Sequence, residues 1–425
     1  MAAIEDIKSA IIEREEELQK KFQNEKIIER EEHKKTQQFI GLDSAFIITG
    51  PRRCGKSILA YMLMHEKKSA YVNFDDERLR MEASELNKVL EALYSLKGET
   101  EYLIFDEIQN ISGWELFIAR LITTKKIIIT GSNAHLLSKE LATHLTGRHI
   151  DYVLLPFSFR EFLTFKGVEY NLYRTADKAV VKNCFSEYVQ NGGFPLVQKL
   201  GRVFLAGVYK DIIERDILQR YNVRHPAVLK ELAKYLVSNS TGEISFNKLK
   251  DLLHIKSPHT IKNYVSYIQN TYLVFLLERF SFKLKEQMRA PKKVFCIDPG
   301  LAQTVSFKTS EDKGKLLENV VAIELFRDAQ NNKMELYYWK DYQQKEVDFV
   351  IKEGHKVKQL IQVVDISSRI ELPERELVSL LKASKELQCK DLILLTRDYE
   401  AKESISKKTV QFIPVWKWLL TKNQS

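Results

Sequence analysis

Apolar residues recur along this chain with two different periods, and the change from one period to the other separates its regions. In residues 4–38, Ile7, Ile11, Leu18 and Phe22 recur at helical spacing among many Glu and Lys residues. This stretch predicts one or two amphipathic helices. Exposure to water explains their charged face, although such a helix could also cover the edge of the domain that follows.

From residue 45 onward, short apolar runs alternate with helical stretches. The five runs are AFIITG, SAYVNF, EYLIFDE, KKIIIT and DYVLLPF. Buried parallel strands are almost continuously apolar, and helices connect them across the faces of the sheet. The pattern therefore predicts a parallel sheet with covering helices in residues 41–156.

Helical periodicity dominates the middle of the chain. Residues 157–225 are helical in period, with a break at Asn191-Gly192-Gly193-Phe194-Pro195. Residues 226–289 contain three helical segments and a strand-like end, which is the order of elements in a winged helix. Residues 290–425 return to mixed strands and helices, with the apolar runs KVFCID, MELYYWKD, EVDFVIKEG, QLIQVVDI and DLILLT.

Length and composition agree with several folded domains. The chain has 425 residues, of which 44% are hydrophobic and 29% charged, with only 16 Gly and 9 Pro, so a wholly disordered or collagen-like chain is excluded. At about 100–200 residues per domain, this length allows two to four domains. The predicted division is 1–40, 41–156, 157–225, 226–289 and 290–425.

No feature of the sequence predicts a membrane segment or a disulfide scaffold. No apolar run reaches the roughly 18 residues of a membrane span, and the start lacks the apolar core of a signal peptide. The four cysteines lie far apart, with no C-x-x-C pair and no clustered His. We therefore expect a cytoplasmic protein with no membrane partner.

The positive charge is concentrated in one region. The chain carries 66 Lys and Arg against 57 Asp and Glu, a net charge of +9. Residues 201–293 alone hold seventeen Lys and Arg against eight Asp and Glu, a difference of nine. Such an excess is typical of a surface that binds DNA or another polyanion, and equally of an ordinary solvated exterior. Both interpretations stay open.

A phosphate-binding motif directly follows the first apolar run. Residues 47–57 read Ile-Ile-Thr-Gly-Pro-Arg-Arg-Cys-Gly-Lys-Ser, which fits G-x-x-x-x-G-K-[ST] between a strand and a helix. The glycines let backbone N–H groups point at phosphate oxygens, and the helix that begins at Lys56 adds its N-terminal dipole. We predict that Lys56 bridges the β and γ phosphates and that Ser57 holds Mg²⁺. The predicted nucleotide-binding residues are Gly50, Pro51, Arg52, Arg53, Cys54, Gly55, Lys56, Ser57 and Ile58.

A second element supports this interpretation. The run Tyr102 to Phe105 ends in two carboxylates, Asp106 and Glu107. After a phosphate-binding loop, Asp106 is placed to coordinate the magnesium and Glu107 to deprotonate the attacking water. The pair therefore predicts hydrolysis.

Two further residues are candidates for catalysis. Asn133 follows another apolar strand and could reach the γ phosphate, or it could cap the next helix together with Ser132. Arg148 precedes the last strand of the predicted sheet, where an arginine can reach a neighbouring subunit's γ phosphate or form a surface ion pair.

In this order, the motifs resemble those of a known family, the AAA+ ATPases of archaea and bacteria with a C-terminal domain of unknown function. The resemblance rests on residues 50–57, 103–107, 130–133, 147–148 and 156–162 and extends over roughly residues 40–405. It implies that Arg148 is an arginine finger, that Asn133 is a sensor, and that Gly192 to Pro195 lies in a helical lid beside the nucleotide. The signal-transducing NTPases, which have a winged helix after the lid, are also similar.

The C-terminal domain of that family resembles restriction-endonuclease-like folds. Such a site needs an acidic residue on one strand and Glu-x-Lys on the next, so that carboxylates bind Mg²⁺ and Lys steadies the water. Glu318 and Glu346-Val347-Asp348 fall in place, but the second strand reads Gln362-Val363-Val364. Asp365 would point away from the face of Val364 or lie beyond the strand. We therefore predict a nuclease-like domain that is inactive and serves binding or assembly.

Together these observations predict an α/β chain: a P-loop AAA+ parallel sheet with a helical lid, a winged helix and a C-terminal restriction-endonuclease-like α/β domain. The predicted function is hydrolysis of ATP to ADP and phosphate with Mg²⁺, coupled to binding of DNA through residues 201–293 or of a protein, in a homo-oligomer. One alternative is a nucleotide-gated switch or scaffold with little turnover. Another is an active nuclease, in which Asp348 meets a lysine such as Lys352 or Lys358 at one metal.

Overall fold

The computed structural model describes residues 3–65, 67–133, 145, 147–306, 312–332 and 334–422. Contacts between residues divide the chain into two compact units, Met1–Leu155 and Pro156–Ser425. This division falls at the end of the predicted ATPase core, 41–156. The finer divisions at 40, 225 and 289 stay predictions.

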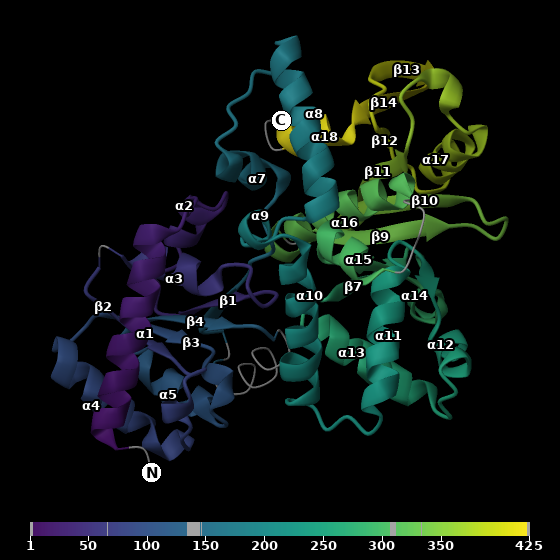
Figure 1. Cartoon of the computed structure of the whole chain (residues 1–425). Helices are drawn as coiled ribbons and strands as arrows, with labels where there is room; N and C mark the ends of the chain where they lie inside the picture. The colour runs from purple at the N-terminus through teal and green to yellow at the C-terminus, as the bar shows by residue number, and fades with distance from the viewer. Residues whose placement is uncertain are drawn as a thin grey trace. The chain divides into compact units, whose positions relative to one another are not determined.

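The first unit is built on the predicted parallel sheet. Its five strands are ordered β2-β3-β4-β1-β5, and each pairs in parallel with its neighbours (Figure 1). The strands are β1 (Ala45–Thr49), β2 (Ser69–Asn73), β3 (Tyr102–Asp106), β4 (Lys126–Gly131) and β5 (His149–Val153). The run DYVLLPF was expected to form the last strand, but β5 begins before it, at His149. It ends at Val153, which pairs with Thr49, because β1 ends there and the phosphate-binding loop begins.

Helices surround this sheet in the first unit. They are α1 (Ile4–Asn24), α2 (His33–Gln37), α3 (Lys56–Met64), α4 (Leu86–Lys97) and α5 (Trp114–Leu121), with short 3₁₀ turns η1 (Glu77–Leu79), η2 (Ala83–Glu85) and η3 (Ile108–Asn110). Helix α1 buries Ile7, Ala10, Ile11 and Leu18 and packs on α4 and on the edge strand β2. The amphipathic helix was expected either to be simply exposed to water on its charged face or to cover the edge of the next domain. The structure shows the second arrangement, because α1 packs on the edge strand.

The second unit contains a mixed sheet of nine strands in the order β13-β14-β12-β11-β10-β9-β7-β8-β6. The strands are β6 (Glu243–Ile244), β7 (Val274–Arg279), β8 (Lys292–Cys296), β9 (Glu335–Lys340), β10 (Glu346–Glu353), β11 (Lys356–Val364), β12 (Asp391–Thr396), β13 (Ala401–Ile405) and β14 (Lys408–Pro414). Strand β7 pairs in parallel with β9 through Glu278 and Tyr337. The sheet thus continues from the predicted winged-helix segment into the predicted nuclease-like segment.

Helices of the second unit follow the expected order up to residue 289. They are α7 (Phe159–Lys166), α8 (Thr175–Asn191), α9 (Val197–Leu200), α10 (Arg202–Asp211), the π-helical η4 (Ile212–Leu218), α11 (Pro226–Ser238), α12 (Phe246–Leu252), α13 (Pro258–Asn270), α14 (Leu284–Arg289), α15 (Pro299–Val305), α16 (Lys313–Asn332), the 3₁₀ turn η5 (Arg369–Glu371), α17 (Glu374–Glu386) and α18 (Val415–Thr421). Helices α11 to α13 precede the antiparallel pair β7 and β8. The winged-helix assignment itself stays a prediction. No helix in the described part of the chain is both long and apolar enough to cross a membrane.

The break at residues 191–195 has a structural cause within the second unit. Helix α8 ends at Asn191, and Gly192 has a φ of +80°. A Cβ atom on Gly192 would collide with the carboxylate of Asp298, whose oxygens accept hydrogen bonds from the N–H groups of Gly193 at 2.7 Å and Leu301 at 2.8 Å. Burial raises the pKa of Asp298 to about 6. This contact joins the end of α8 to the start of α15, and the proposed position of Gly192 to Pro195 beside a nucleotide stays a prediction.

Candidate nucleotide-binding site

Of the predicted site residues of the first unit, all but Arg148 lie at the carboxyl ends of its strands. Strands β1, β3 and β4 are parallel, and their register pairs Asp106 with Thr130 and Thr49 with Gly131. The phosphate-binding loop begins at Gly50, directly after Thr49. Because carboxyl ends of parallel strands share an edge, the loop, the Asp106-Glu107 pair and Asn133 all lie at that edge.

The phosphate-binding loop needs its two glycines. Gly50 has a φ of +144° and Gly55 a φ of +104°, values that residues with a side chain rarely adopt. A Cβ atom on Gly50 would also collide with the carbonyl oxygen of Leu154. The loop leads into α3, which begins at Lys56. The sequence thus folds into the tight turn and helix start that a phosphate group requires.

Lys56 is buried and is held by its own loop. Its ammonium donates hydrogen bonds to the carbonyl oxygens of Gly50 at 3.2 Å and Pro51 at 3.0 Å. An ammonium has three N–H donors, and these two bonds use two of them. Lys56 therefore keeps one donor beyond these two loop contacts with which to bind a phosphate.

Asp106 is buried at the end of β3 between two hydroxyl groups. The Tyr71 hydroxyl donates to one carboxylate oxygen at 2.6 Å, and the Thr130 hydroxyl donates to the other. Burial and the negative charge of Asp106 raise the pKa of Tyr71 well above its ordinary value, so Tyr71 remains a donor. Ser57, at the start of α3, and Asp106 supply a hydroxyl and a carboxylate, which are oxygen ligands of the kind that Mg²⁺ binds.

Glu107 lies directly after β3 in an unusual backbone conformation. Its φ is +54°, and its N–H group donates to the carbonyl oxygen of Thr130 at 3.0 Å. Its carboxylate accepts hydrogen bonds from the Gln109 amide and, at 3.3 Å, from the Ser132 hydroxyl. Both hydrogen bonds are to the same carboxylate oxygen, Oε2, and they lower the basicity of the carboxylate.

Asn133 and Arg148 lie at opposite ends of the strands of the sheet. Asn133 is fully buried just after β4, at the edge of the phosphate-binding loop. Arg148 is exposed just before β5, whose first residue, His149, pairs with Ala45 at the start of β1. Four residues of β1 lie between that end of the sheet and the phosphate-binding loop, a distance of about 13 Å. Arg148 therefore lies at one end of the strands, and the phosphate-binding loop of its own chain lies at the other end.

The structure adds residues that the sequence did not point to. Arg30, from the segment between α1 and α2, is buried and donates to the carbonyl oxygens of Cys54 at 3.2 Å and Leu155 at 2.7 Å. These two hydrogen bonds link the phosphate-binding loop to the segment that follows β5. No local pattern identifies Arg30, and Tyr71 differs in no visible way from other strand residues.

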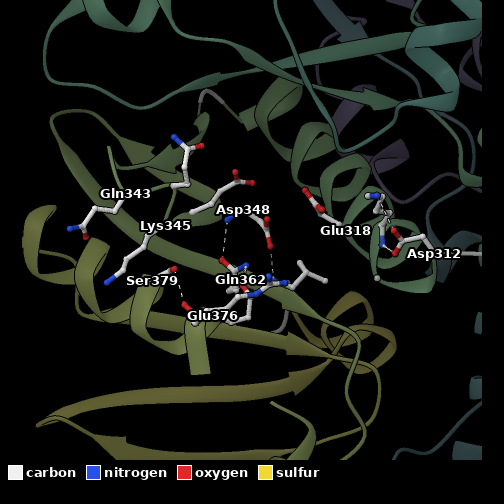
Figure 2. Close-up of a pocket in the computed structure, with 14 residues that line it drawn as sticks. Asp312, Glu318, Gln343, Lys345, Asp348, Gln362, Glu376 and Ser379 are labelled. Carbon is white, nitrogen blue, oxygen red and sulfur yellow. Dashed lines mark hydrogen bonds and ion pairs between the residues drawn. The ribbon is translucent and has the colours of Figure 1, made fainter. Parts of the chain in front are cut away.

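A second polar site lies in the other unit, where the nuclease-like residues were predicted. A cavity of about 650 Å³ is lined by residues of α16, β10, β11 and α17, and Figure 2 shows Glu318, Asp348, Gln362 and Glu376 turned toward it. Asp348 accepts a hydrogen bond from the N–H of Val363 at 2.9 Å, and its own N–H donates to Gln362. The predicted acidic residues and Gln362 thus come together.

The lysine that contacts Asp348 is not one of those predicted. Lys352 pairs with Glu335 at 2.6 Å and Lys358 with Glu353 at 2.7 Å, so neither contacts Asp348. Instead Lys293, on β8, reaches Asp348 at 3.0 Å. The hypothesis that Lys352 or Lys358 serves a metal there is wrong. Within the described ranges, no group of three or more His, Cys, Asp or Glu side chains is arranged to hold a metal ion.

The sheet and the loop geometry of the first unit define a P-loop protein of the AAA class. An AAA domain family matches residues 42–163. Two families named only as domains of unknown function match residues 183–312 and 313–418. The predicted AAA+ resemblance is thus confirmed for the N-terminal part, and the restriction-endonuclease-like assignment stays a prediction.

Relatives cover nearly the whole chain. An uncharacterized protein of Methanocaldococcus jannaschii is 35% identical over 396 residues, which is 88% of this chain and 88% of the relative. An uncharacterized protein of Haemophilus influenzae is 28% identical over 408 residues, 90% of this chain and 96% of the relative. The chain belongs to the same family as the Methanocaldococcus jannaschii protein.

Solved structures are similar at a lower level. The replication initiator DnaA bound to AMPPCP and single-stranded DNA is 15% identical, with a TM-score of 0.27 over 58% of this chain and 90% of that chain. A signal-transduction ATPase with a tetratricopeptide repeat sensor from Pyrococcus horikoshii is 13% identical, with a TM-score of 0.27 over 71% of this chain and 45% of that chain. At these scores, the class of the protein rests on the AAA domain match and on the sheet.

Proposed function

We propose that this protein binds ATP with Mg²⁺ at the phosphate-binding loop and hydrolyses it to ADP and phosphate. The observation that carries the proposal is the shared sheet edge of Lys56, Asp106 and Glu107, fixed by the register of β1, β3 and β4. These three residues supply a phosphate-binding ammonium, a carboxylate for the metal and a carboxylate for the water.

Each residue of this site would have a separate task. Loop N–H groups and Lys56 would bind the β and γ phosphates, and Ser57 and Asp106 would hold Mg²⁺. The ion supplies positive charge that offsets the charge of the phosphates. Glu107, whose Oε2 accepts hydrogen bonds from Gln109 and Ser132, would accept the proton of the attacking water. Asn133, buried at the same edge, is proposed to orient that water or the γ phosphate.

Two variants separate binding from hydrolysis. Lys56→Ala removes the phosphate-binding ammonium, so we expect ATP affinity to fall, whereas Lys34→Ala removes an exposed cation and serves as the control. Glu107→Gln keeps the shape of the side chain but cannot accept the proton, so turnover should fall about 100-fold or more while ATP binding survives. Glu101→Gln, at an exposed position before the same strand, is its control. Unchanged turnover in Glu107→Gln would show that Glu107 is not the base.

A nucleotide-gated switch with little turnover is the second candidate. Two sets of hydrogen bonds favour this switch. Gln109 and Ser132 bind the Glu107 carboxylate, and Lys56 is bound by its own loop. If the bonds to the Glu107 carboxylate persist with nucleotide bound, Glu107 is a weaker base, so hydrolysis is slow and the bound state itself is the signal. Tight ATP binding with negligible turnover in the full chain supports the switch.

The proposed output of either mechanism is binding of DNA or a protein through residues 201–293. Helix α13 buries Ile261, Tyr264 and Val265 and exposes His259 and Lys262. An exposed polar face with a cation, in a segment of net positive charge, suits contact with phosphates. We expect duplex DNA to raise turnover, with affinity that falls as salt rises. DNA binding that is insensitive to salt would instead favour a protein partner for this surface.

A further inference from the structure

Lys293 lies where three carboxylates converge, beside the cavity of the second unit. Its ammonium lies 2.8 Å from Glu318, 2.5 Å from Glu346 and 3.0 Å from Asp348. We call these four residues the Lys293 cluster. The carboxylates come from α16 and β10, whereas Lys293 comes from β8. Four charges from three elements thus meet at one point of the fold.

The cluster is largely removed from water, so its charges are stabilised mainly by one another. The Lys293 side chain is only 4% exposed, and those of Glu318 and Asp348 are 14% and 8% exposed. Burial opposes charge on Lys293, but Glu318, Asp348 and Glu346 together hold its pKa well above the ordinary value. Lys293 is therefore charged at neutral pH. Glu346, at 26%, is the most exposed of the three carboxylates. Without a cation among them, three carboxylates so far removed from water would repel one another strongly.

A divalent cation is the other group that such carboxylates could hold, and the residues present do not fit one. The Lys293 ammonium already occupies the point to which the carboxylates are directed, and Lys340 also pairs with Glu346, at 3.2 Å. On the neighbouring strand, Gln362 and Val364 offer neither a carboxylate nor a cation. Burial raises the pKa of Glu318, and the Lys293 ammonium, 2.8 Å away, opposes that rise.

We propose that Lys293 is the resident cation of this site and takes the place that a divalent metal would hold between the same carboxylates. The cavity beside the cluster then needs no divalent metal to balance these carboxylates. Its lining supplies amide, hydroxyl and carboxylate groups from Gln343, Gln362, Glu376 and Ser379 and an ammonium from Lys345 (Figure 2). The Gln362 amide donates to Glu376 at 2.9 Å, which helps to fix the shape of the cavity floor.

The test is whether removal of the ammonium creates a metal site. Lys293→Met keeps most of the side-chain volume and removes the charge, leaving Glu318, Glu346 and Asp348 without their cation. In nucleotide-free full-length protein, we expect this variant to take up one more Mn²⁺ ion per chain than the wild type, measured by the loss of the free-ion electron paramagnetic resonance signal. Saturating Mn²⁺ should also raise its melting temperature by about 4 °C or more, with no comparable rise in the wild type.

A charge-balanced variant guards against misfolding. Lys293→Met combined with Glu318→Gln keeps the net charge of the cluster, so it should fold and still bind Mn²⁺ through Glu346 and Asp348. Adding Asp348→Asn should abolish that binding. A folded double variant that takes up no more Mn²⁺ than the wild type overturns the proposal. Wild-type binding of Mn²⁺ that Asp348→Asn removes overturns it as well, because the metal would then bind beside Lys293.

Discussion

The carboxylate of Asp106 depends on a tyrosine from a neighbouring strand. Tyr71, on β2, donates its hydroxyl hydrogen to Asp106 at 2.6 Å inside the sheet. Groups that orient a metal ligand commonly change metal affinity by about 10- to 100-fold when they are removed. Tyr71→Phe deletes only this donor, and we expect the Mg²⁺ concentration for half-maximal turnover to rise about tenfold.

Titration of turnover with Mg²⁺ at saturating ATP measures this shift, and Tyr173→Phe is the matched control because Tyr173 is 96% exposed. Turnover of Tyr71→Phe at saturating Mg²⁺ should remain close to that of the wild type. If the Mg²⁺ curve of Tyr71→Phe coincides with that of the wild type, Tyr71 does not affect the binding of Mg²⁺.

At the residue scale, the sequence predicted the site where side chains follow a local motif. Gly50, Lys56 and Asp106 could be placed because a loop and a strand end keep functional groups at fixed spacing. Lys293 could not be predicted, because it meets Asp348 only through the pairing of β8, β7, β9 and β10. Contacts that depend on strand order leave no signal in residue spacing.

At the element scale, the junction between α8 and α15 carries a buried acid. Asp298 has a pKa of about 6 because of its burial, although the N–H groups of Gly193, Leu301 and Gly300 oppose the rise. A carboxyl whose pKa is higher in the folded than in the unfolded state binds more protons when folded. Its contribution to the free energy of unfolding is therefore fully present below about pH 4 and falls by about 3 kcal/mol as the pH rises through about 6.

Asp298→Asn tests this dependence, because asparagine resembles the protonated acid and does not titrate. We expect the stability of the wild type relative to the variant to decrease between pH 4.5 and 7 and to stay level above that. Urea unfolding followed by tryptophan fluorescence suits this measurement, since Trp339, Trp416 and Trp418 all lie in the second unit. Asp251→Asn, at an exposed position, is the control. A difference that is constant with pH would contradict the raised pKa.

Elements with a continuous apolar run could be predicted from the sequence, and elements at the edge of the second sheet could not. All five runs of the first unit lead to strands. Strands β1, β3 and β4 are almost wholly buried, whereas β5 buries only Tyr152 and Val153. Strands β13 and β14 were missed. Strand β13, Ala401–Ile405, alternates between exposed and half-buried residues at the end of the sheet, so it lacks the apolar run by which the other strands were predicted.

At the scale of the whole molecule, the position of Arg148 bears on assembly. Arg148 is exposed at the start of β5, and the phosphate-binding loop lies at the other ends of the same strands. A side chain so placed cannot serve its own loop without crossing the sheet. We propose that it serves the γ phosphate of a neighbouring subunit, so that the complete site forms only in a homo-oligomer.

This arrangement predicts complementation between two inactive variants. Arg148→Ala should lower turnover on the order of 10³-fold, since it removes a cation that stabilises the charge of the transition state. Lys56→Ala should be inactive for want of phosphate binding. In a mixed oligomer, a subunit with Arg148→Ala still has Lys56, and a Lys56→Ala neighbour can supply Arg148 to it. Mixing the two variants should therefore restore turnover that neither shows alone, and turnover of the wild type should rise with protein concentration.

The control mixture combines Arg148→Ala with the double variant Lys56→Ala and Arg148→Ala. This mixture contains intact phosphate-binding loops but no Arg148 in any subunit, so its turnover should stay at the level of Arg148→Ala alone. Size-exclusion chromatography establishes that each mixture assembles. If the first mixture assembles and gains no activity over the control, Arg148 does not act between subunits. The exposed arginine then belongs to the surface of the first unit, and the site at the carboxyl ends of β1, β3 and β4 works without it.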